Sequence, residues 1–204
     1  MYASYVFPRL MDWVLGGECF QRERQRLLAA AEGIVLEIGL GTGLNLPHYP
    51  RTVTVLHAAD PSPMLQDRVA ARMAQAPFPI HIRHLSAEAL PYDDAMFTCV
   101  VSTFTLCTIP DPVMALREVR RVLKPDGRFL FLEHGRSNDS NIAKWQDRLN
   151  SLENWLACGC NLNRRIDRLV RTAGLDLDSL DRYVLPGLPR IGGEMYRGMA
   201  RPGL

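Results

Sequence analysis

The sequence lacks a long apolar run, and it lacks an excess of charge of either sign. No stretch approaches the roughly 20 apolar residues that a membrane-spanning helix needs. The amino terminus also lacks the basic start and apolar core of a signal peptide. The formal net charge is +2, whereas proteins that bind nucleic acid usually carry a strongly basic surface. We therefore expect no nucleic-acid partner and no stable membrane insertion.

The cysteine pattern of a disulfide-stapled or zinc-binding protein is also missing. The five cysteines are an odd number, and Cys158 and Cys160 form C-x-C rather than C-x-x-C. No histidine cluster completes a zinc site, because His81 and His84 would face opposite sides of a predicted strand. These absences predict a reducing, cytoplasmic location and no bound metal.

What the sequence does contain is a glycine cluster after an apolar run. The 204 residues, 47% of them hydrophobic, suit one domain with a sizeable core. Ile34 to Ile38 predict a buried parallel strand, and Gly39, Gly41 and Gly43 follow just before a possible helix start. Glycines there let the chain turn sharply and let a ligand lie against the backbone. The pattern predicts a nucleotide-type cofactor at the carboxyl end of the first strand of an open α/β sheet.

Two residues near these glycines distinguish between cofactors. The fingerprint for dinucleotides needs a glycine where this chain has Leu44. Glu37 lies inside the strand, and its carboxylate would repel a pyrophosphate but attract a cation. S-adenosylmethionine carries a sulfonium and an ammonium and no phosphate. The loop therefore favours S-adenosylmethionine over NAD, and an NAD-dependent oxidoreductase is the alternative from another class.

The segment E-I-G-L-G-T-G resembles motif I of the class I methyltransferases, in which an acidic residue precedes G-x-G-x-G. A second predicted strand, Val53 to Ala59, ends at Asp60, about 20 residues past the first glycine, where a carboxylate can accept both ribose hydroxyls. The segment D-P-S-P-M resembles the family's second motif, so Asp60, Pro61 and Ser62 are candidate cofactor residues. By the same resemblance Met64 would pack on the adenine. The alternative for this segment is a helix cap.

After a third predicted strand, Ile80 to Leu85, the segment S-A-E-A-L-P-Y resembles the family's G-D-A-E-x-L-P-F. The family's Asp bonds the adenine amino group, and Ser86 stands in its place here. A hydroxyl can accept that bond without charge assistance. The backbone N–H of Ala87 would meet the adenine ring, and Glu88 completes the match. For Glu88 a solvated loop charge is the alternative.

The carboxyl ends of the next two predicted strands provide the candidate catalytic residues. Thr98 to Thr103 predict the fourth strand, so Thr103, Leu106 and Cys107 would face the ligand crevice. A buried structural thiol is the alternative for Cys107. The fifth strand leads to His134, whose unperturbed pKa near 6.5 suits a general base. A structural histidine is the alternative there.

The pattern as a whole, read with the resemblance, predicts a Rossmann-like, seven-stranded, mostly parallel sheet. Helices would cover both faces, and an antiparallel hairpin near 177–184 and 194–200 would close the sheet. Residues 1–32 would form a helical lid or cap and 33–204 the methyltransferase domain. Apolar residues at helical spacing from Phe7 to Leu15 support the first part. An edge helix and a lipid-contacting helix are the alternatives for it.

Two further matches concern the methyl acceptor. V-V-S-T-F-T-L-C-T-I followed by L-E-H, and later G-C-N-L-N-R, resemble the methyltransferase-like 7 family, which methylates alkyl thiols. From the sequence we expect no counterpart of that family's hydrophobic amino-terminal membrane anchor. Quinone-precursor C-methyltransferases and bacterial phosphatidylethanolamine N-methyltransferases share the first motif and the fifth strand. The resemblance thus implies S-adenosylmethionine as cofactor, S-adenosylhomocysteine as product and a small-molecule or lipid-like acceptor. A non-catalytic cofactor-binding protein is a further alternative, and the oligomeric state is left open.

Overall fold

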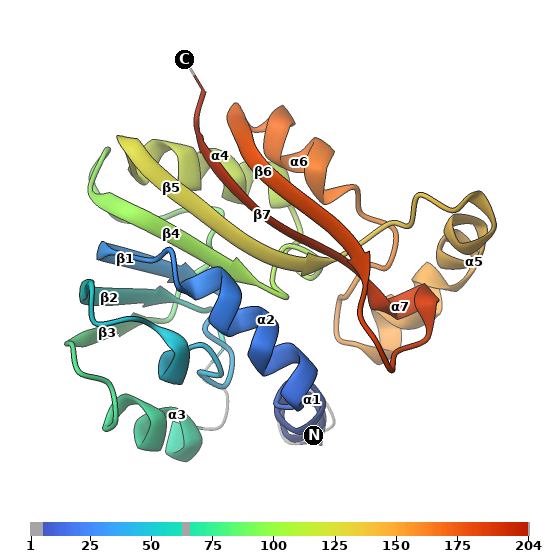
Figure 1. Cartoon of the computed structure of the whole chain (residues 1–204), viewed down its shortest axis with the longest axis horizontal. Helices are drawn as coiled ribbons and strands as arrows, with labels where there is room; N and C mark the ends of the chain where they lie inside the picture. The colour runs from blue at the N-terminus through green and yellow to red at the C-terminus, as the bar shows by residue number, and fades with distance from the viewer. Residues whose placement is uncertain (1–5, 63–65, 204) are drawn as a thin grey trace.

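A computed structural model describes residues 6–62 and 66–203, and over these residues the chain forms one sheet with helices on both faces (Figure 1). The strands are β1 (Gly33–Ile38), β2 (Val53–Ala59), β3 (Ile80–Arg83), β4 (Phe97–Thr103), β5 (Leu123–His134), β6 (Leu175–Val184) and β7 (Glu194–Pro202). The helices are α1 (Phe7–Leu15), α2 (Glu18–Leu28), α3 (Gln66–Met73), α4 (Pro112–Val122), α5 (Ser140–Leu156), α6 (Ile166–Thr172) and α7 (Arg190–Gly193), with a 3-10 turn, η2 (Leu46–His48).

The strand order in this sheet is β3-β2-β1-β4-β5-β7-β6. The neighbours from β3 to β5 pair in parallel, and β7 runs antiparallel to both β5 and β6. The chain leaves β1 toward β2 on one side and returns to β4 on the other, so the strand order reverses beside β1. Open α/β sheets bind ligands outside the carboxyl ends of the strands at such a reversal. The predicted fold class is confirmed, including the closing hairpin.

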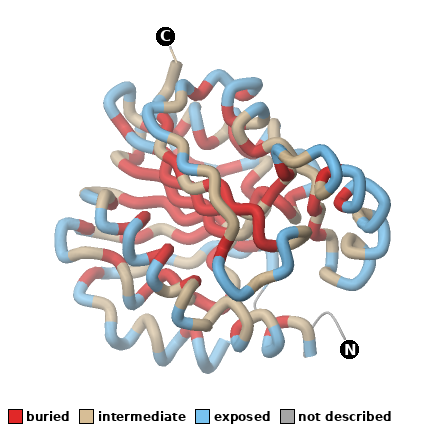
Figure 2. Tube along the Cα trace, turned by 45° about the vertical axis from the view of Figure 1, so that its right-hand side comes forward, coloured by how far each residue is buried: buried red, intermediate tan, exposed pale blue. Residues whose placement is uncertain are grey.

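Alternating side chains on the central strands separate two cores, one on each face of the sheet. On β5, Phe129 and Phe131 pack with α4 and α6, whereas Leu130 and Leu132 pack on the side of α2 and α3. Figure 2 shows that burial concentrates in these central strands. Because both faces are covered, the strands carry almost continuous apolar runs, as parallel strands do.

The structure differs from the sequence-based expectation in two connections. A helix was expected soon after the glycines, but the described chain between β1 and β2 has only the short turn η2. Asn45 and Tyr49, on either side of this turn, both reach back to the Glu37 carboxylate, which holds the segment against β1 instead of letting it coil away. The predicted loop between the last two strands contains the short helix α7.

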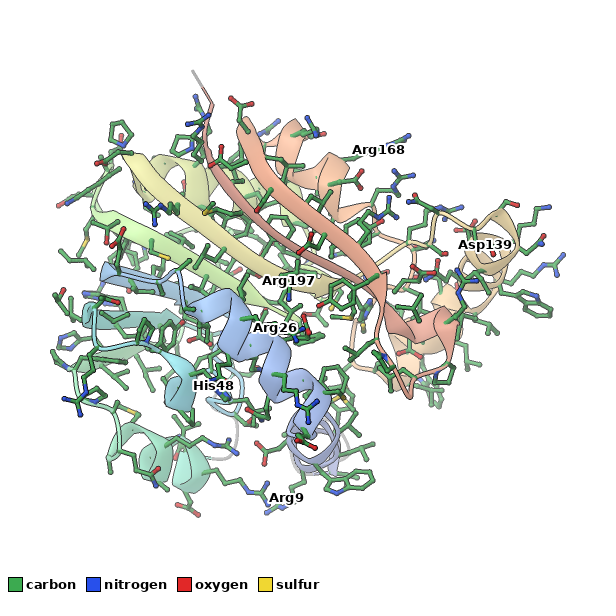
Figure 3. The ribbon with its side chains drawn as sticks, in the orientation of Figure 1. Arg9, Arg26, His48, Asp139, Arg168 and Arg197 are labelled. Carbon is green, nitrogen blue, oxygen red and sulfur yellow. The ribbon has the colours of Figure 1, made fainter. Side chains whose placement is uncertain are left out.

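The amino-terminal helices are integrated to different degrees. Phe20, Leu27 and Leu28 of α2 are buried in the core beneath it. Glu23 of α2 is also buried, and it pairs with Arg26 at 2.7 Å and with Arg197 of β7 at 2.7 Å, two arginines that are labelled in Figure 3. Helix α2 is therefore packed firmly against the sheet. The predicted domain boundary at residue 32 and the predicted movement of a lid stay predictions.

Helix α1 lies next to α3 and is held there by charge. Its buried Asp12 pairs with Arg72 at 2.8 Å and also with Arg68. The Arg72 guanidinium additionally donates to the carbonyl of Thr42 in the glycine loop. No helix among the described residues combines the length and the hydropathy needed to cross a membrane.

Candidate functional site

The three glycines after β1 adopt backbone conformations that disfavour other residues. Their φ angles are +74° at Gly39, +55° at Gly41 and +78° at Gly43. A Cβ at Gly39 would lie 2.1 Å from the Thr105 hydroxyl oxygen, so this glycine allows the loop to pack on the end of β4. A Cβ at Gly41 would meet nothing within 4 Å. Gly41 therefore offers its backbone to open space, where a ligand can approach it closely.

Asp60, at the end of β2, connects the glycine loop to the segment that follows β2. One carboxylate oxygen accepts the N–H of Gly41 at 2.7 Å, and the other accepts the N–H of Ser62 at 2.9 Å. The residue is only 7% exposed. Burial raises the pKa of Asp60, and the two backbone donors oppose that rise. Both N–H donors favour the charged form of Asp60, whose carboxylate lies where the strand order reverses.

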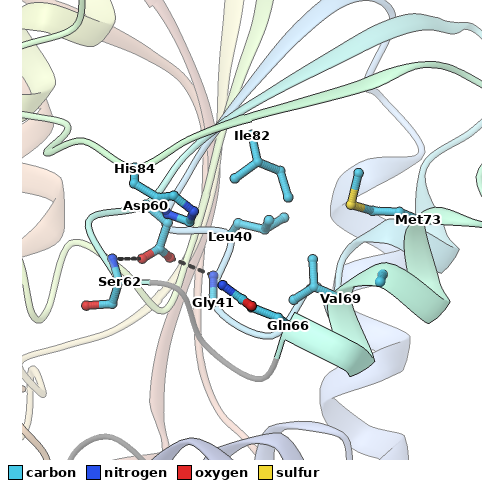
Figure 4. A pocket seen from close by; sticks show the side chains of 10 residues that line it. Leu40, Gly41, Asp60, Ser62, Gln66, Val69, Met73, Ile82 and His84 are labelled. Atoms are coloured by element: carbon cyan, nitrogen blue, oxygen red, sulfur yellow. Dashed lines mark hydrogen bonds between the residues drawn. The ribbon is translucent and has the colours of Figure 1, made fainter.

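A cavity of about 160 Å³ opens beside Asp60 and Gly41 (Figure 4). Its walls are mostly aliphatic and come from the loop, from α3 and from the end of β3: Leu40, Gly41, Asp60, Ser62, Gln66, Val69, Ala70, Met73, Ile82 and His84. Of these residues, the sequence motifs indicate Gly41, Asp60 and Ser62. The helical period could have indicated Val69 and Met73, but no local signal pointed to His84. The cavity suits part of a nucleoside-like ligand.

Glu37 lies beneath the glycine loop, and its carboxylate is bound inside the protein. Tyr49 donates to one oxygen at 2.8 Å and Asn45 to the other at 2.9 Å. The Asn45 amide nitrogen also donates to the Thr103 hydroxyl at 3.0 Å, and its oxygen accepts from Arg24 at 3.1 Å. Glu37, Thr103 and Arg24 thus meet at one buried asparagine, which sequence reasoning missed.

Burial changes the proton affinity of both charged groups in this network. It raises the pKa of Glu37 to about 7, against the hydrogen bonds from Tyr49 and Asn45. It lowers the pKa of Arg24 to about 10, against the attraction of Glu37. Since Glu37 is fully buried and both of its oxygens are taken, the structure gives it a bracing position under the loop. A direct contact with the cofactor stays a prediction.

The segment after β3 is organised by Glu88. Its carboxylate accepts the Ser86 hydroxyl at 2.7 Å and the N–H of Asp111, the residue before α4, at 2.7 Å. The Ser86 oxygen in turn accepts the Glu88 N–H at 3.2 Å. Ala87 is buried between them. None of these three residues is among those that line the cavity in Figure 4, so their predicted contact with adenine stays a prediction.

Of the remaining predicted cofactor residues, Pro61 and Ser62 are exposed. Met64 lies outside the described residues. Leu106 is buried, and its N–H and that of Thr105 each donate to one carboxylate oxygen of Glu133 at 3.1 Å. Ser102 donates to the same oxygen at 2.7 Å, while the other oxygen of Glu133 has no hydrogen-bond partner. Glu133 therefore shapes the end of β4, a role that sequence reasoning missed.

Both predicted catalytic residues, Cys107 and His134, lie together at the ends of β4 and β5. A third residue joins them, because Nε2 of His134 lies 2.8 Å from Sγ of Cys160. The two sulfur atoms and a ring nitrogen all lie within 4.8 Å of one another. We call these three residues the sulfur–imidazole cluster. In the sequence, Cys160 belongs to the C-x-C pair and to the segment G-C-N-L-N-R, and neither pattern indicates that it lies beside His134.

The proton affinities in this cluster depend on one another. The hydrogen bond from Cys107, followed by the contact with His134, lowers the pKa of Cys160 to about 5, and the pKa of Cys107 is raised. Burial lowers the pKa of His134, but the contact with Cys160 outweighs burial and raises it. The ring nitrogen that a general base would use is therefore engaged, and the catalytic roles of His134 and Cys107 stay predictions.

Comparison with known proteins identifies the family. The methyltransferase-domain family matches residues 36–131. Human thiol S-methyltransferase TMT1B is 31% identical over 195 residues, which are 88% of this chain and 77% of the relative. The chain belongs to the S-adenosylmethionine-dependent methyltransferases.

Two further comparisons describe the extent of the similarity. Human thiol S-methyltransferase TMT1A is 34% identical over 162 residues, 74% of this chain and 64% of the relative, so the chain covers less than two thirds of that protein. The Burkholderia thailandensis 1,6-didemethyltoxoflavin-N1-methyltransferase, solved with S-adenosylhomocysteine, superimposes with a TM-score of 0.68 at 17% identity, covering 94% of this chain and 81% of that one. It shares the fold.

The residues at the reversal fit the cofactor of this methyltransferase family. Gly41 leaves space where a side chain would project, and the Asp60 carboxylate lies beside it. The Arg72 guanidinium, which donates to the Thr42 carbonyl of the loop, is paired with Asp12, and the Arg24 guanidinium donates to Asn45. The loop therefore presents backbone groups and a carboxylate, which suit ribose hydroxyls and a cationic ligand better than a pyrophosphate.

We predict that Gly41→Ala weakens binding of S-adenosylhomocysteine at least tenfold, because the added methyl group would occupy the open side of the loop. Gly187→Ala is the matched control, since Gly187 also has a positive φ, +85°, and nothing within 4 Å of its Cβ position. Both changes cost about 1 kcal/mol of strain. Calorimetric titration measures the affinities, and equal affinity in the two variants would contradict the prediction.

We also predict a pH-dependent effect of Glu37→Gln. The pKa of Glu37 rises from 4.5 to about 7 on folding, so the folded protein holds this proton more tightly and loses stability as the pH rises from about 5 through 7. The glutamine does not titrate. Between pH 5 and pH 8 the free energy of unfolding should therefore shift in favour of the variant by roughly 1–3 kcal/mol. Urea unfolding at both pH values measures this, and parallel pH profiles would refute it.

Proposed function

We propose that the protein transfers a methyl group from S-adenosylmethionine to a thiol. The observation that carries this proposal is the position of the sulfur–imidazole cluster at the ends of β4 and β5, next to the strand-order reversal where the glycine loop and Asp60 lie. The relatives TMT1A and TMT1B, which are named thiol S-methyltransferases, support the same acceptor.

The residues of the loop would hold and orient the cofactor. Asp60 would accept the ribose hydroxyls, and the backbone at Gly41 would lie against the ligand. Ser86 and Ala87 would contact the adenine. When bound, S-adenosylmethionine supplies a methyl group already activated by its positive sulfur. The protein then has to align donor and acceptor about 3 to 3.5 Å apart, and such alignment can lower the barrier by roughly 7–11 kcal/mol.

The acceptor thiol must lose a proton before or during transfer. A thiol with a pKa near 8.5 is partly ionised at neutral pH, so a modest contribution from a neighbouring base is enough. His134 and Cys107 are the proposed residues on the acceptor side, because they lie beyond Leu106 at the ends of adjacent strands. Exclusion of water there would favour the thiolate as nucleophile over hydroxide.

Other acceptors remain as alternatives within the same family. A phospholipid amine or a quinone-precursor carbon would use the same donor and the same Asp60, and would differ only in what contacts the cluster. Membership of the methyltransferase family disfavours an NAD-dependent oxidoreductase. A cytoplasmic location stays a prediction from the cysteine pattern.

We expect methylation of alkyl thiols, and not of phosphatidylethanolamine vesicles or quinols, in an assay with methyl-labelled S-adenosylmethionine. Asp60→Ala should abolish transfer and lower cofactor affinity at least tenfold in calorimetric titration, because both the carboxylate and its hold on Gly41 are lost. Circular dichroism of the variant controls for folding. Transfer to the amine or the quinol, without transfer to thiols, would replace the proposed acceptor. A folded Asp60→Ala protein that binds cofactor as tightly as the parent would contradict the site.

A separate prediction concerns the acceptor side. His134→Ala should lower turnover of a thiol by about 100-fold, while the affinity for S-adenosylhomocysteine changes less than threefold, because His134 pairs with Cys160 and is not among the residues that line the cavity beside Asp60. Steady-state kinetics together with titration separate the two effects. A parallel loss of cofactor affinity would place His134 on the cofactor side instead.

A further inference from the structure

The sulfur–imidazole cluster is assembled from three separate segments of the chain. Cys107 follows β4, His134 ends β5 and Cys160 follows α5. Cys107 is 1% exposed and Cys160 8%, and His134 is half-buried. Two thiols and an imidazole from distant parts of the sequence therefore converge in an enclosed place. The two sulfur atoms and the imidazole nitrogen lie close enough together to hold one metal ion.

The backbone around Cys160 is built to keep it there. The N–H of Asn161 donates to the Cys107 carbonyl at 3.0 Å, and the Asn161 side chain donates to the same oxygen at 3.0 Å. Asn154 of α5 holds the Gly159 carbonyl at 3.0 Å. Gly159 has a φ of +104°, which turns the chain sharply just before Cys160. The neighbouring Cys158 is exposed, so the turn buries one cysteine of the C-x-C pair and exposes the other.

Charged groups around the cluster balance a divalent cation. Glu133 and Glu153 both act electrostatically on His134, and Arg164 acts on the two cysteines. The guanidinium of Arg164 is held by backbone carbonyls, among them that of Ile109 at 2.7 Å. Two thiolates neutralise a divalent ion, and the positive charge of Arg164 is opposed by Glu133. An ion in the cluster would therefore leave no buried excess of positive charge.

We propose that Cys107, His134 and Cys160 bind a zinc ion and leave its fourth coordination position to a non-protein ligand. Zinc takes thiolate sulfur at about 2.3 Å and imidazole nitrogen at about 2.0–2.1 Å in tetrahedral geometry, which puts the ligand atoms roughly 3.5–3.8 Å apart. The three ligand atoms lie within 4.8 Å of one another, and His134 Nε2 and Cys160 Sγ, now 2.8 Å apart, would have to separate by roughly 0.7 Å to reach this spacing.

The ion would tie the ends of β4 and β5 to the loop that follows α5. These three segments form the acceptor side of the site, so the metal fixes their relative positions. Local sequence spacing gives no sign of such a site, because the ligands have no C-x-x-C pair and come together only in the folded chain. The inference is independent of the methyl acceptor, since binding of the ion can be measured without turnover.

The test is metal analysis of the purified 204-residue chain after incubation with zinc chloride and desalting. We expect close to one zinc per chain for the parent and for Cys158→Ser, and a loss of at least fivefold in Cys107→Ser and in Cys160→Ser. Cys158→Ser is the matched control because it removes an exposed thiol two residues from Cys160. Cobalt in place of zinc should give thiolate-to-metal charge-transfer absorption in the parent and in Cys158→Ser, but not in Cys160→Ser.

A second measurement covers the case in which the cluster variants fail to fold. Chelation of the parent should lower its melting temperature, and equimolar zinc should restore it. The same treatment should act equally on Cys158→Ser. Less than 0.2 zinc per chain in the folded, fully reduced parent would overturn the proposal. So would full zinc retention in both Cys107→Ser and Cys160→Ser, or a Cys107–Cys160 disulfide that persists in reducing buffer.

Discussion

The structure depends on a carboxylate buried under its ligand loop. Glu37 projects from β1 into the core on the side of α2, and Asn45 and Tyr49 donate to its two oxygens. These bonds pull the chain after the glycines back over β1. Asn45 also accepts a hydrogen bond from Arg24 of α2 and donates one to Thr103 of β4. A buried charge without such partners costs several kcal/mol, so the loop, the helix and the strand hold one another in place.

Asp60 provides the second brace of the loop, from the other side. Its two oxygens accept the N–H groups of Gly41 and Ser62, so one carboxylate connects the glycine loop to the segment that follows β2. Burial raises the pKa of this group, while the donors favour its charged form. The glycine at position 41 leaves the space next to it open. A rigid sheet, two braced loops and an open backbone are what a methyltransferase needs to orient a donor that is already reactive.

The acceptor side follows the same principle with different groups. Glu133 accepts hydrogen bonds from the Ser102 hydroxyl and from the N–H groups of Thr105 and Leu106. These bonds fix the path of the chain that leads from β4 to Cys107. Asn161 then joins the loop after α5 to Cys107. Hydrogen bonds between segments far apart in the chain thus decide where the cysteines lie. A zinc ion in the cluster would take the His134 nitrogen that a general base needs, so with the ion bound this imidazole would position the acceptor side and would not accept the proton.

Local patterns in the sequence determined the strands, the glycine loop and the position of Asp60. These features depend on neighbouring residues: an apolar run, glycines that permit positive φ, and an acidic residue at the end of the next strand. The sequence did not determine that a 3-10 turn follows the glycines, that α3 closes a cavity beside Asp60, or that Cys160 meets His134. Each of these depends on contacts between segments far apart in the chain. Only the packed sheet decides which strand ends and loops lie together. Contacts between distant segments contribute free energy only when the chain folds, so no local pattern in the sequence reports them.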